Sequence, residues 1–367
     1  MQTTGAARRS SQRSEHVTDR TLGFGIVGTG MIAPVHVAAI ADCPGARLAA
    51  VADAVEDRAR DFGDRHGVAW FGDYREMLKD PEVDIVCVCT PSGLRGDIAV
   101  DAARAGKHVI CEKPLEITLR KADAVISECD RAGVKLAVIM QNRFLEGVQA
   151  AKSLMEDGRL GRPVLGDAYV KWHRPQSYYD SISWRGTWAM DGGGVLINQA
   201  IHYIDLLQWM MGPVESIQSI TATLARSIEV EDTAVACLKF ASGALGVIEA
   251  CTSAYPGASA KLELRGEAGT LVVKDGCIVY QCIEGEEAPA ADNAAGMGGA
   301  SDPSAISDIG HVRQIADMVD AVQNDRSPMI DGREGRKAIE IILGIYEASR
   351  TGRAVQLPLV SGPDSSD

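Results

Sequence analysis

The stretch that decides the fold is Gly25-Ile26-Val27-Gly28-Thr29-Gly30-Met31-Ile32-Ala33. It follows a short apolar run and precedes a helical pattern, which predicts a tight turn from a strand into a helix. Gly28 would form that turn, and Gly30 would let backbone amides approach a pyrophosphate without a side chain in the way. Ala33 is small enough for the helix to pack closely. The residues expected to hold a dinucleotide here are Gly28, Thr29, Gly30, Met31 and Ile32.

Asp53 follows the second predicted strand, 25 residues after Gly28. A carboxylate at this spacing accepts hydrogen bonds from the adenosine ribose and repels a 2′-phosphate. The sequence therefore predicts NAD, with NADP less favoured, although Arg58 one turn later could weaken that preference. Glycine-rich turns also occur for packing alone, but here strand, helix and acidic residue fall in register.

The first part of the chain alternates short apolar runs with helical stretches, which is typical of a parallel sheet covered by helices. Strands are predicted at 22–27, 47–52, 84–89, 107–111 and 135–140. The intervening helices are predicted to begin near Ile32, Val55, Arg75, Arg95 and Leu119.

After residue 141 the pattern changes. Aromatic residues cluster at 169–188, and alternating apolar and polar residues predict a mostly antiparallel sheet. Its predicted segments are 214–226, 230–240, 243–252, 259–265 and 269–280, with helices at 145–157, 194–211 and 309–324, and a mobile loop at 286–300. The fold class is thus an α/β Rossmann domain followed by an α+β domain with a large open sheet. The predicted units are a flexible tail at 1–20, an NAD(P)-binding domain at 21–140, a substrate-binding and oligomerisation domain at 141–358, and a tail at 359–367.

Composition excludes several classes of protein. A formal net charge of −13 argues against a nucleic-acid-binding surface. No apolar stretch reaches membrane-spanning length, and the arginine-containing first twenty residues lack the apolar centre of a secretion signal. The nine cysteines are odd in number and lie mainly in apolar runs, which favours free thiols in a reducing cytoplasm and no metal site.

Two polar groups stand out from apolar surroundings. Lys113 follows the predicted strand 107–111 and would emerge at the carboxyl edge of the sheet, where such folds bind ligands. An ammonium beside a nicotinamide can stabilise a developing alkoxide, although many lysines after strands are simply at the surface. The second group is a stripe on the predicted helix after the glycine run 192–194, where a lone histidine is more often structural. Its members, at i, i+4, i+7 and i+11, are Asn198, His202, Asp205 and Trp209.

With these motifs the chain resembles the Gfo/Idh/MocA family of oxidoreductases. The resemblance extends from residue 22 to about residue 358. Its most specific marks are Gly106-Lys107-His108-Val109 with Glu112-Lys113-Pro114, and Gly192-Gly193-Gly194 with a histidine eight residues later. It implies NAD(P)-dependent oxidation of a sugar, a cyclitol or a derivative of either. In that scheme Lys113 is the catalytic lysine, His202 exchanges a proton with the reacting hydroxyl, Thr90-Pro91 and Glu112 lie against the cofactor, and Trp184-Arg185 border the substrate.

The sequence departs from the family pattern at two positions. Asn198 stands where many relatives have aspartate, and an amide can orient a ring or a hydroxyl but cannot stabilise an imidazolium as a carboxylate does. Arg95 stands where Thr-Pro-x-x-x-His would place histidine, and it could meet a cofactor phosphate.

The aromatic segment offers a stacking platform for a sugar ring. Tyr178, Tyr179 and Trp184 lie beside polar residues and are the candidates for the cleft, whereas Trp172 and Trp188 are expected in the core.

The expected reaction is oxidation of a secondary hydroxyl, with C3 as one candidate carbon, of a sugar, amino sugar, nucleotide sugar or aminoglycoside. His202 would act as base, Lys113 as positioner and stabiliser, and Asn198 as orienter. The alternatives are a ketosugar reductase, a non-catalytic NAD-binding regulator, and an enzyme that recycles its bound cofactor. The open sheet predicts a homodimer or homotetramer.

Overall fold

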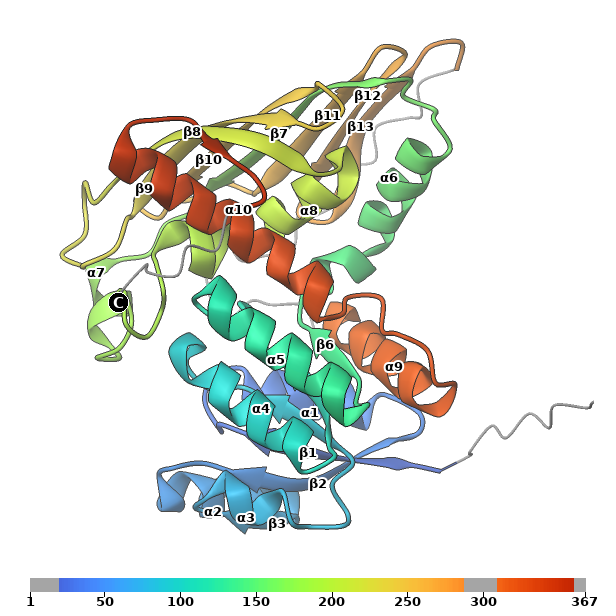
Figure 1. The fold of residues 1–367 in the computed structure, drawn as a ribbon, viewed down its shortest axis with the longest axis vertical. Coiled ribbons are helices and arrows are strands. Elements are labelled where there is room, and N and C mark those ends of the chain that lie inside the picture. Colours follow the sequence, from blue (N-terminus) through green and yellow to red (C-terminus); the bar gives the residue numbers. More distant parts are fainter. Residues whose placement is uncertain (1–19, 287–308, 360–367) are drawn as a thin grey trace, which may run out of the picture.

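The computed structural model describes residues 20–286 and 309–359. The predicted tails at 1–20 and 359–367 and the predicted mobile loop at 286–300 lie almost wholly outside these residues. Within them the chain forms two sheets with helices between and around them (Figure 1).

The first sheet has six parallel strands in the order β3-β2-β1-β4-β5-β6, as in a doubly wound nucleotide-binding fold. Its glycine-rich turn follows β1, whose six residues are all buried. The strands are β1 (Leu22–Val27), β2 (Ala46–Ala52), β3 (Ala69–Phe71), β4 (Ile85–Val88), β5 (His108–Cys111) and β6 (Leu136–Val138). The helices are α1 (Ala33–Ala41), α2 (Glu56–His66), α3 (Tyr74–Met77), α4 (Arg95–Arg104) and α5 (Leu119–Ala132), with 3₁₀ turns η1 (Ser92–Leu94) and η2 (Gln141–Phe144). The five predicted strands are confirmed, and the three-residue β3 was too short to show a pattern.

The second sheet has eight strands in the order β13-β12-β11-β7-β10-β9-β8-β14. Neighbouring strands are antiparallel except for the parallel pair β7 and β10. The strands are β7 (Pro163–Lys171), β8 (Val214–Ala222), β9 (Thr233–Phe240), β10 (Leu245–Cys251), β11 (Lys261–Gly266), β12 (Gly269–Lys274), β13 (Cys277–Ile283) and β14 (Val355–Gln356). The single segment predicted at 269–280 is wrong, because Asp275 and Gly276 adopt positive φ angles of 46° and 85° and reverse the chain between two strands.

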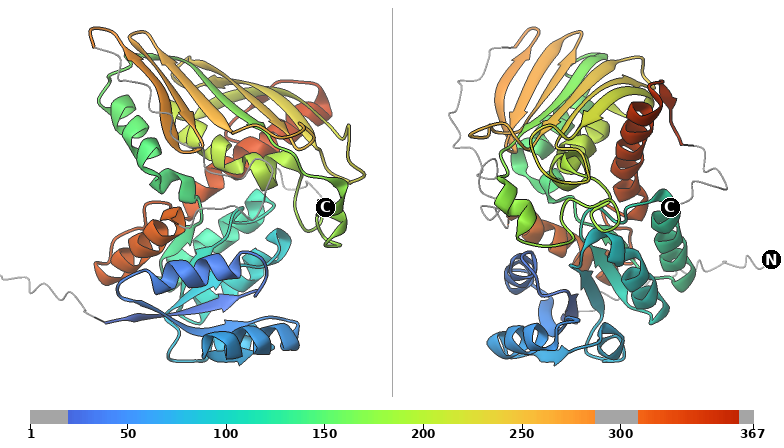
Figure 2. Two further views of the ribbon diagram at one scale, coloured as in Figure 1. Left: turned by 180° about the vertical axis from the view of Figure 1, so that it is seen from behind. Right: turned by 90° about the vertical axis from the view of Figure 1, so that its left-hand side faces the viewer.

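Helices cover one face of the second sheet. α6 (Glu146–Glu156), α8 (Ile201–Met211) and α10 (Gly332–Thr351) lie on the side that faces the first domain, and the described residues place no helix on the opposite face (Figures 1 and 2). The short α7 (Gln176–Asp180) and the π-helical turn η3 (Leu196–Ala200) lie near the junction of the domains. Strand β7 and helix α10 were not predicted.

The two domains share a continuous core. Buried residues of the first sheet, such as Val88, belong to the same cluster as Ile342 of α10 and Leu238 of β9. α9 (Ile309–Gln323) follows the second sheet in sequence but packs on the first, where Ile315 and Met318 join Phe24 and Ile26 in a second cluster. No helix in the described parts of the chain combines the length and apolar character needed to cross a bilayer.

Candidate active site

The glycine turn after β1 has the features that a dinucleotide needs. Gly28 has φ 94°, and a Cβ there would lie 3.0 Å from the backbone of Cys89. A Cβ on Gly30 would meet nothing within 4 Å, and the neighbouring Met31 is 64% exposed. The outer surface of the turn is therefore open for a pyrophosphate, with Ile32 leading into α1.

Asp53 lies directly beside this turn. Its Oδ2 accepts hydrogen bonds from the backbone nitrogen and the hydroxyl of Thr29, both at 2.9 Å, and its Oδ1 accepts one from Val55 N at 2.9 Å. The structure thus brings together the glycine turn and the acidic residue that the sequence placed 25 positions apart. Arg58 is exposed on α2.

Arg95 connects two turns at the carboxyl edge of the sheet. The side chain is buried, and it donates to Thr90 O at 2.9 Å and to Pro114 O at 2.8 Å. It also donates to the Ser92 hydroxyl at 3.3 Å. Because these bonds direct the donors of Arg95 to protein oxygens, the side chain is better placed to position Thr90-Pro91 and Lys113-Pro114 than to bind a cofactor phosphate, the contact that the sequence had suggested.

Lys113 reaches across from the first domain to the turn before α8. Its Nζ donates to the backbone oxygen of Asn198 at 2.7 Å. Burial lowers the pKa of Lys113 to about 8, the charge of Glu112 opposes this change, and Arg95 adds to it. The ammonium is therefore held in the site but is easier to deprotonate than a surface lysine.

His202 lies close to this ammonium at the beginning of α8. It is 9% exposed, and burial followed by the positive charge of Lys113 lowers its pKa to about 3. Its Nδ1 is buried and has no hydrogen-bond partner within the described residues. The imidazole is thus neutral at ordinary pH.

The predicted stripe on this helix divides into two parts. The π-helical turn η3 contains Asn198, and His202 is the second residue of the helix α8 that follows it. Both residues are near Lys113. The other two members face away, since Asp205 forms a buried ion pair with Arg143 at 2.6 Å and Trp209 lies under the same guanidinium, 5.0 Å from its centre. The helix predicted at 194–211 is confirmed over residues 195–211, but residues 196–200 within it form a π-helical turn.

The turn before α8 is held in place by Glu231 and Tyr346, which the sequence did not indicate. Glu231 accepts hydrogen bonds from Gly194 N at 2.8 Å and Leu196 N at 3.0 Å, and from the Tyr346 hydroxyl at 2.9 Å. A Cβ on Gly194 would lie 1.8 Å from the backbone oxygen of Glu231, so glycine is required there. Burial raises the pKa of Glu231 to about 7.

Asp191 was also missed, although it directly precedes the glycine run. It is 2% exposed. Its Oδ1 accepts from Asn198 Nδ2 at 3.1 Å, and its Oδ2 accepts from Gly186 N at 2.7 Å. Burial raises the pKa of Asp191 to about 6, while the charges of Arg185 and Lys113 act in the opposite direction.

Glu112 lies beneath Lys113 in a buried cluster with two histidines. Its Oε1 is 2.8 Å from His36 Nε2 and 3.8 Å from His311 Nε2. Burial alone would raise the pKa of Glu112, but the two histidines hold it well below its usual range. Among the described residues, these three form the one group that could hold a metal ion. The distance of 2.8 Å between His36 Nε2 and Glu112 Oε1 is that of a direct hydrogen bond. The side chain thus lies buried under the site, and its contact with the cofactor stays a prediction.

The aromatic segment contributes a cationic and aromatic wall. The guanidinium carbon of Arg185 lies 4.0 Å from the ring centre of Tyr178, and that of Arg174 lies 5.7 Å from it. Trp184 is half-buried, 5.8 Å from Arg185. Tyr179 is buried and donates its hydroxyl hydrogen bond to Thr252 at 3.0 Å, which gives it a supporting place behind the wall.

The prediction that Trp188 belongs to the core is wrong. It is 45% exposed, because its indole nitrogen donates to Glu229 O at 3.2 Å and holds the ring at the surface against Tyr346. Trp172 packs half-buried against the core, as expected.

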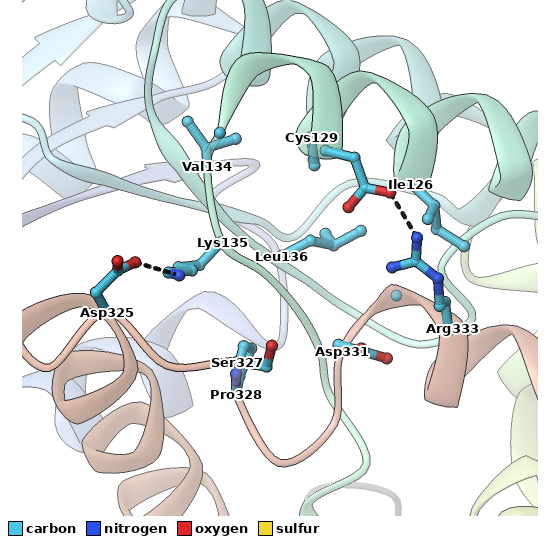
Figure 3. Close-up of a pocket in the computed structure, with 13 residues that line it drawn as sticks. Ile126, Cys129, Val134, Lys135, Leu136, Asp325, Ser327, Pro328, Asp331 and Arg333 are labelled. Carbon is cyan, nitrogen blue, oxygen red and sulfur yellow. Dashed lines mark hydrogen bonds and ion pairs between the residues drawn. The ribbon is translucent and has the colours of Figure 1, made fainter.

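A separate hollow of about 340 Å³ lies between α5, β6 and the segment that leads into α10 (Figure 3). Four of the charged side chains that line it form two ion pairs, Lys135 with Asp325 at 2.7 Å and Arg333 with Asp130 at 2.6 Å. None of the predicted site residues lines it. The candidate active site is therefore the junction around Lys113.

Comparison with known proteins agrees with this geometry. Residues 22–140 match the model of the oxidoreductase family with an NAD-binding Rossmann fold, and residues 148–272 match the GFO/IDH/MocA C-terminal domain. The chain belongs to the GFO/IDH/MocA family. This confirms the predicted fold class and NAD as the cofactor, and it makes the protein an oxidoreductase that acts on CH–OH groups.

Relatives of this GFO/IDH/MocA enzyme act on sugars and cyclitols. The WlbA dehydrogenase from Bordetella pertussis, solved in complex with NADH and UDP-GlcNAcA, is 36% identical, with a TM-score of 0.85 and coverage of 94% of this chain and 99% of that one. Myo-inositol 2-dehydrogenase of Thermotoga maritima is 32% identical over 68% of this chain and 74% of its own length. D-apiose dehydrogenase of Paraburkholderia graminis is 27% identical over 90% and 88%.

Proposed function

We propose that this enzyme oxidises the C3 hydroxyl of a nucleotide-linked amino-sugar uronate of the UDP-GlcNAcA type and transfers the hydride to NAD. The observation that supports oxidation is the contact of Lys113 Nζ with the turn that carries Asn198 and His202, at the carboxyl edge of the NAD-binding sheet. The substrate class is supported by the likeness to the WlbA dehydrogenase, which extends over nearly the whole of both chains.

The charges around the site also favour an anionic substrate. The chain as a whole has a net charge of −13, yet Arg95 and Arg174 both lie close enough to Lys113 to lower its pKa. Arg174 is 3% exposed, and Arg185 stands on the same tyrosine ring. A uronate carboxylate or a diphosphate would be stabilised by such a group of cations.

The residues suggest a division of tasks. Bound NAD would supply the hydride acceptor. Lys113, in its ammonium form, would donate a hydrogen bond to the reacting oxygen and stabilise negative charge on it. The neutral His202 would accept the hydroxyl proton, and Asn198 would orient the ring. The glycine turn with Asp53 would bind the dinucleotide, while Tyr178, Trp184 and Arg185 would border the sugar.

The uncovered face of the second sheet supports a homo-oligomer. Exposed apolar side chains that share this face include Ile220, Val235 and Leu245. We expect this face to be buried between subunits, which sedimentation of the purified protein would test.

The test of function is reduction of NAD and of NADP with a matched panel of substrates. UDP-GlcNAcA, its neutral counterpart UDP-GlcNAc, free glucuronate and myo-inositol separate the effects of nucleotide, carboxylate and ring. The proposal predicts turnover of the first with NAD, and weak or no turnover of the last two. Preference for a neutral or free sugar would overturn the substrate class.

The rival functions give different results. A ketosugar reductase would oxidise NADH only when a ketone is supplied. An enzyme that recycles its cofactor would be purified with reduced nicotinamide bound. A regulator would bind NAD and turn over none of the panel.

A further inference from the structure

The loop before η3 carries a buried carboxylate that is not assigned any role in the reaction proposed above. Asp191 is 2% exposed, and each of its oxygens accepts one hydrogen bond, from Asn198 Nδ2 and from Gly186 N. The next residues, Gly192 and Gly193, have no space for a side chain, since a Cβ would lie 2.5 Å from Ile117 and 2.1 Å from the Tyr346 hydroxyl. The carboxylate is therefore held in one place.

Its hydrogen bond determines which way the Asn198 amide faces. Because Nδ2 donates to Asp191, the amide oxygen is the group left to point elsewhere, and it can only accept hydrogen bonds. Asn198 would thus present an acceptor to a hydroxyl or N–H of the sugar. Without the carboxylate the amide could turn over and present a donor in its place.

The same carboxylate acts on Lys113. The charged and titratable groups that face Asp191 are Lys113 from the end of β5, Arg185 from its own loop, Arg95 from α4 and Tyr346 from α10. Of the two carboxylates that favour the charged form of Lys113, Glu112 is already engaged by two histidines, and Asp191 is the other. Lys113 Nζ is bound to the backbone oxygen of Asn198, so Asp191 acts on both groups at once.

We propose that Asp191 is a positioning residue of this enzyme, which fixes the Asn198 amide as an acceptor and keeps Lys113 in its charged form. It acts through these two residues and needs no contact with the substrate. The assignment rests on the proposed use of Lys113 and Asn198 in oxidation, but its electrostatic part can be measured without any substrate.

The experiment compares Asp191→Asn with the matched control Glu231→Gln. Both replacements remove a buried carboxylate that binds the same turn, but Asp191 is among the groups with the largest effects on the pKa of Lys113 and Glu231 is not. The titration of Lys113 is followed by NMR after ¹³C reductive methylation, with its signal assigned by its loss in Lys113→Ala.

The proposal expects Lys113 to titrate at lower pH in Asp191→Asn than in the wild type, and at the wild-type pH in Glu231→Gln. With a substrate in hand, kcat of Asp191→Asn should fall about ten- to a hundredfold while the Kd for NAD stays the same. The pH at which kcat declines on the alkaline side should move down with the Lys113 titration.

An unchanged Lys113 titration in Asp191→Asn would overturn the proposal, and so would an equal change in Glu231→Gln. If Asp191→Asn does not fold, the exchange Asp191→Asn with Asn198→Asp restores both the charge and the hydrogen bond. A Lys113 titration near the wild-type pH in the exchanged protein supports the proposal, and a lowered one contradicts it. Absence of turnover with every sugar, alongside the expected titration, would count against the proposed function only.

Discussion

The cofactor turn and the substrate turn of this enzyme are built in different ways. The cofactor turn consists of residues 28–32 together with Asp53, and its hydrogen bonds join residues that directly follow the adjacent strands β1 and β2. The substrate turn consists of residues 186–202, and its shape depends on Glu231 and Tyr346, which lie far along the chain. The cofactor turn thus presents mainly its backbone to the ligand, whereas the substrate turn is shaped by side chains from several elements.

This difference determines what a substitution can do in each place. A Cβ added at Gly30 would point into open space where a cofactor would lie, whereas a Cβ added at Gly194 would collide with the protein backbone. We therefore expect changes in the first turn to affect cofactor binding with folding intact. Changes in the second should affect catalysis and stability together.

The largest expected effect is that of Lys113→Ala. Loss of the ammonium that stabilises the reacting oxygen should lower kcat by about a thousandfold, with the Kd for NAD nearly unchanged. Steady-state kinetics and NAD titration would measure both. Lys121→Ala is the control, because that lysine lies on the outer part of α5, and its kcat should match the wild type. A small effect at Lys113 would remove it from the chemistry.

A matched pair of glycine substitutions tests the comparison directly. Gly194→Ala should lower both Tm and kcat, by about a hundredfold for kcat, because its Cβ would collide with the Glu231 backbone and displace the turn that carries Asn198. Gly30→Ala should weaken NAD binding by a similar factor with Tm unchanged. Calorimetry and NAD titration of both variants are needed, and a reversed pattern would break the contrast between the two turns.

The dependence on pH should be of intermediate size. The pKa of Lys113 is lowered to about 8 in the folded protein, so the ammonium is present below that pH and is lost above it. We expect kcat to decline about tenfold for each pH unit above this value, as for a single required proton. In Lys113→Arg, which stays protonated, the alkaline decline should be absent. A decline that persists in that variant would assign it to another group.

The smallest expected effect is at Asp53. Asp53→Ala removes the acceptor for the ribose hydroxyls and the repulsion of a 2′-phosphate, so KM for NAD should rise by about tenfold and NADP should be used better. Asp57→Ala, which removes an exposed acidic side chain from the following helix α2, is the control. An unchanged ratio of NAD to NADP use would remove Asp53 from the ribose role.

Much of the first domain could be predicted, because its information is local. Consecutive apolar residues identified β1, and spacing connected Gly28 to Asp53. The lysine and histidine were also found from the sequence, and the structure brings them together. No pattern within a window of sequence could show that α9 packs on the first sheet.

The substrate turn shows why the rest could not be predicted. The regular spacing of Asn198 and Asp205 suggested one face of a helix, but a π-helical turn and a buried arginine separate them. The roles of the carboxylates Asp191 and Glu231 depend on hydrogen-bond partners that only the fold brings next to them. A buried polar network of this kind leaves no periodic signal in the sequence.

The most direct test of the central claim is to follow deuterium from C3 of UDP-GlcNAcA into the nicotinamide, with wild type and Lys113→Ala side by side. The account predicts deuterated NADH and a C3 ketone from the wild type, and almost none of either from the variant. Deuterium that stays on the sugar, or equal NADH formation by both proteins, would contradict it.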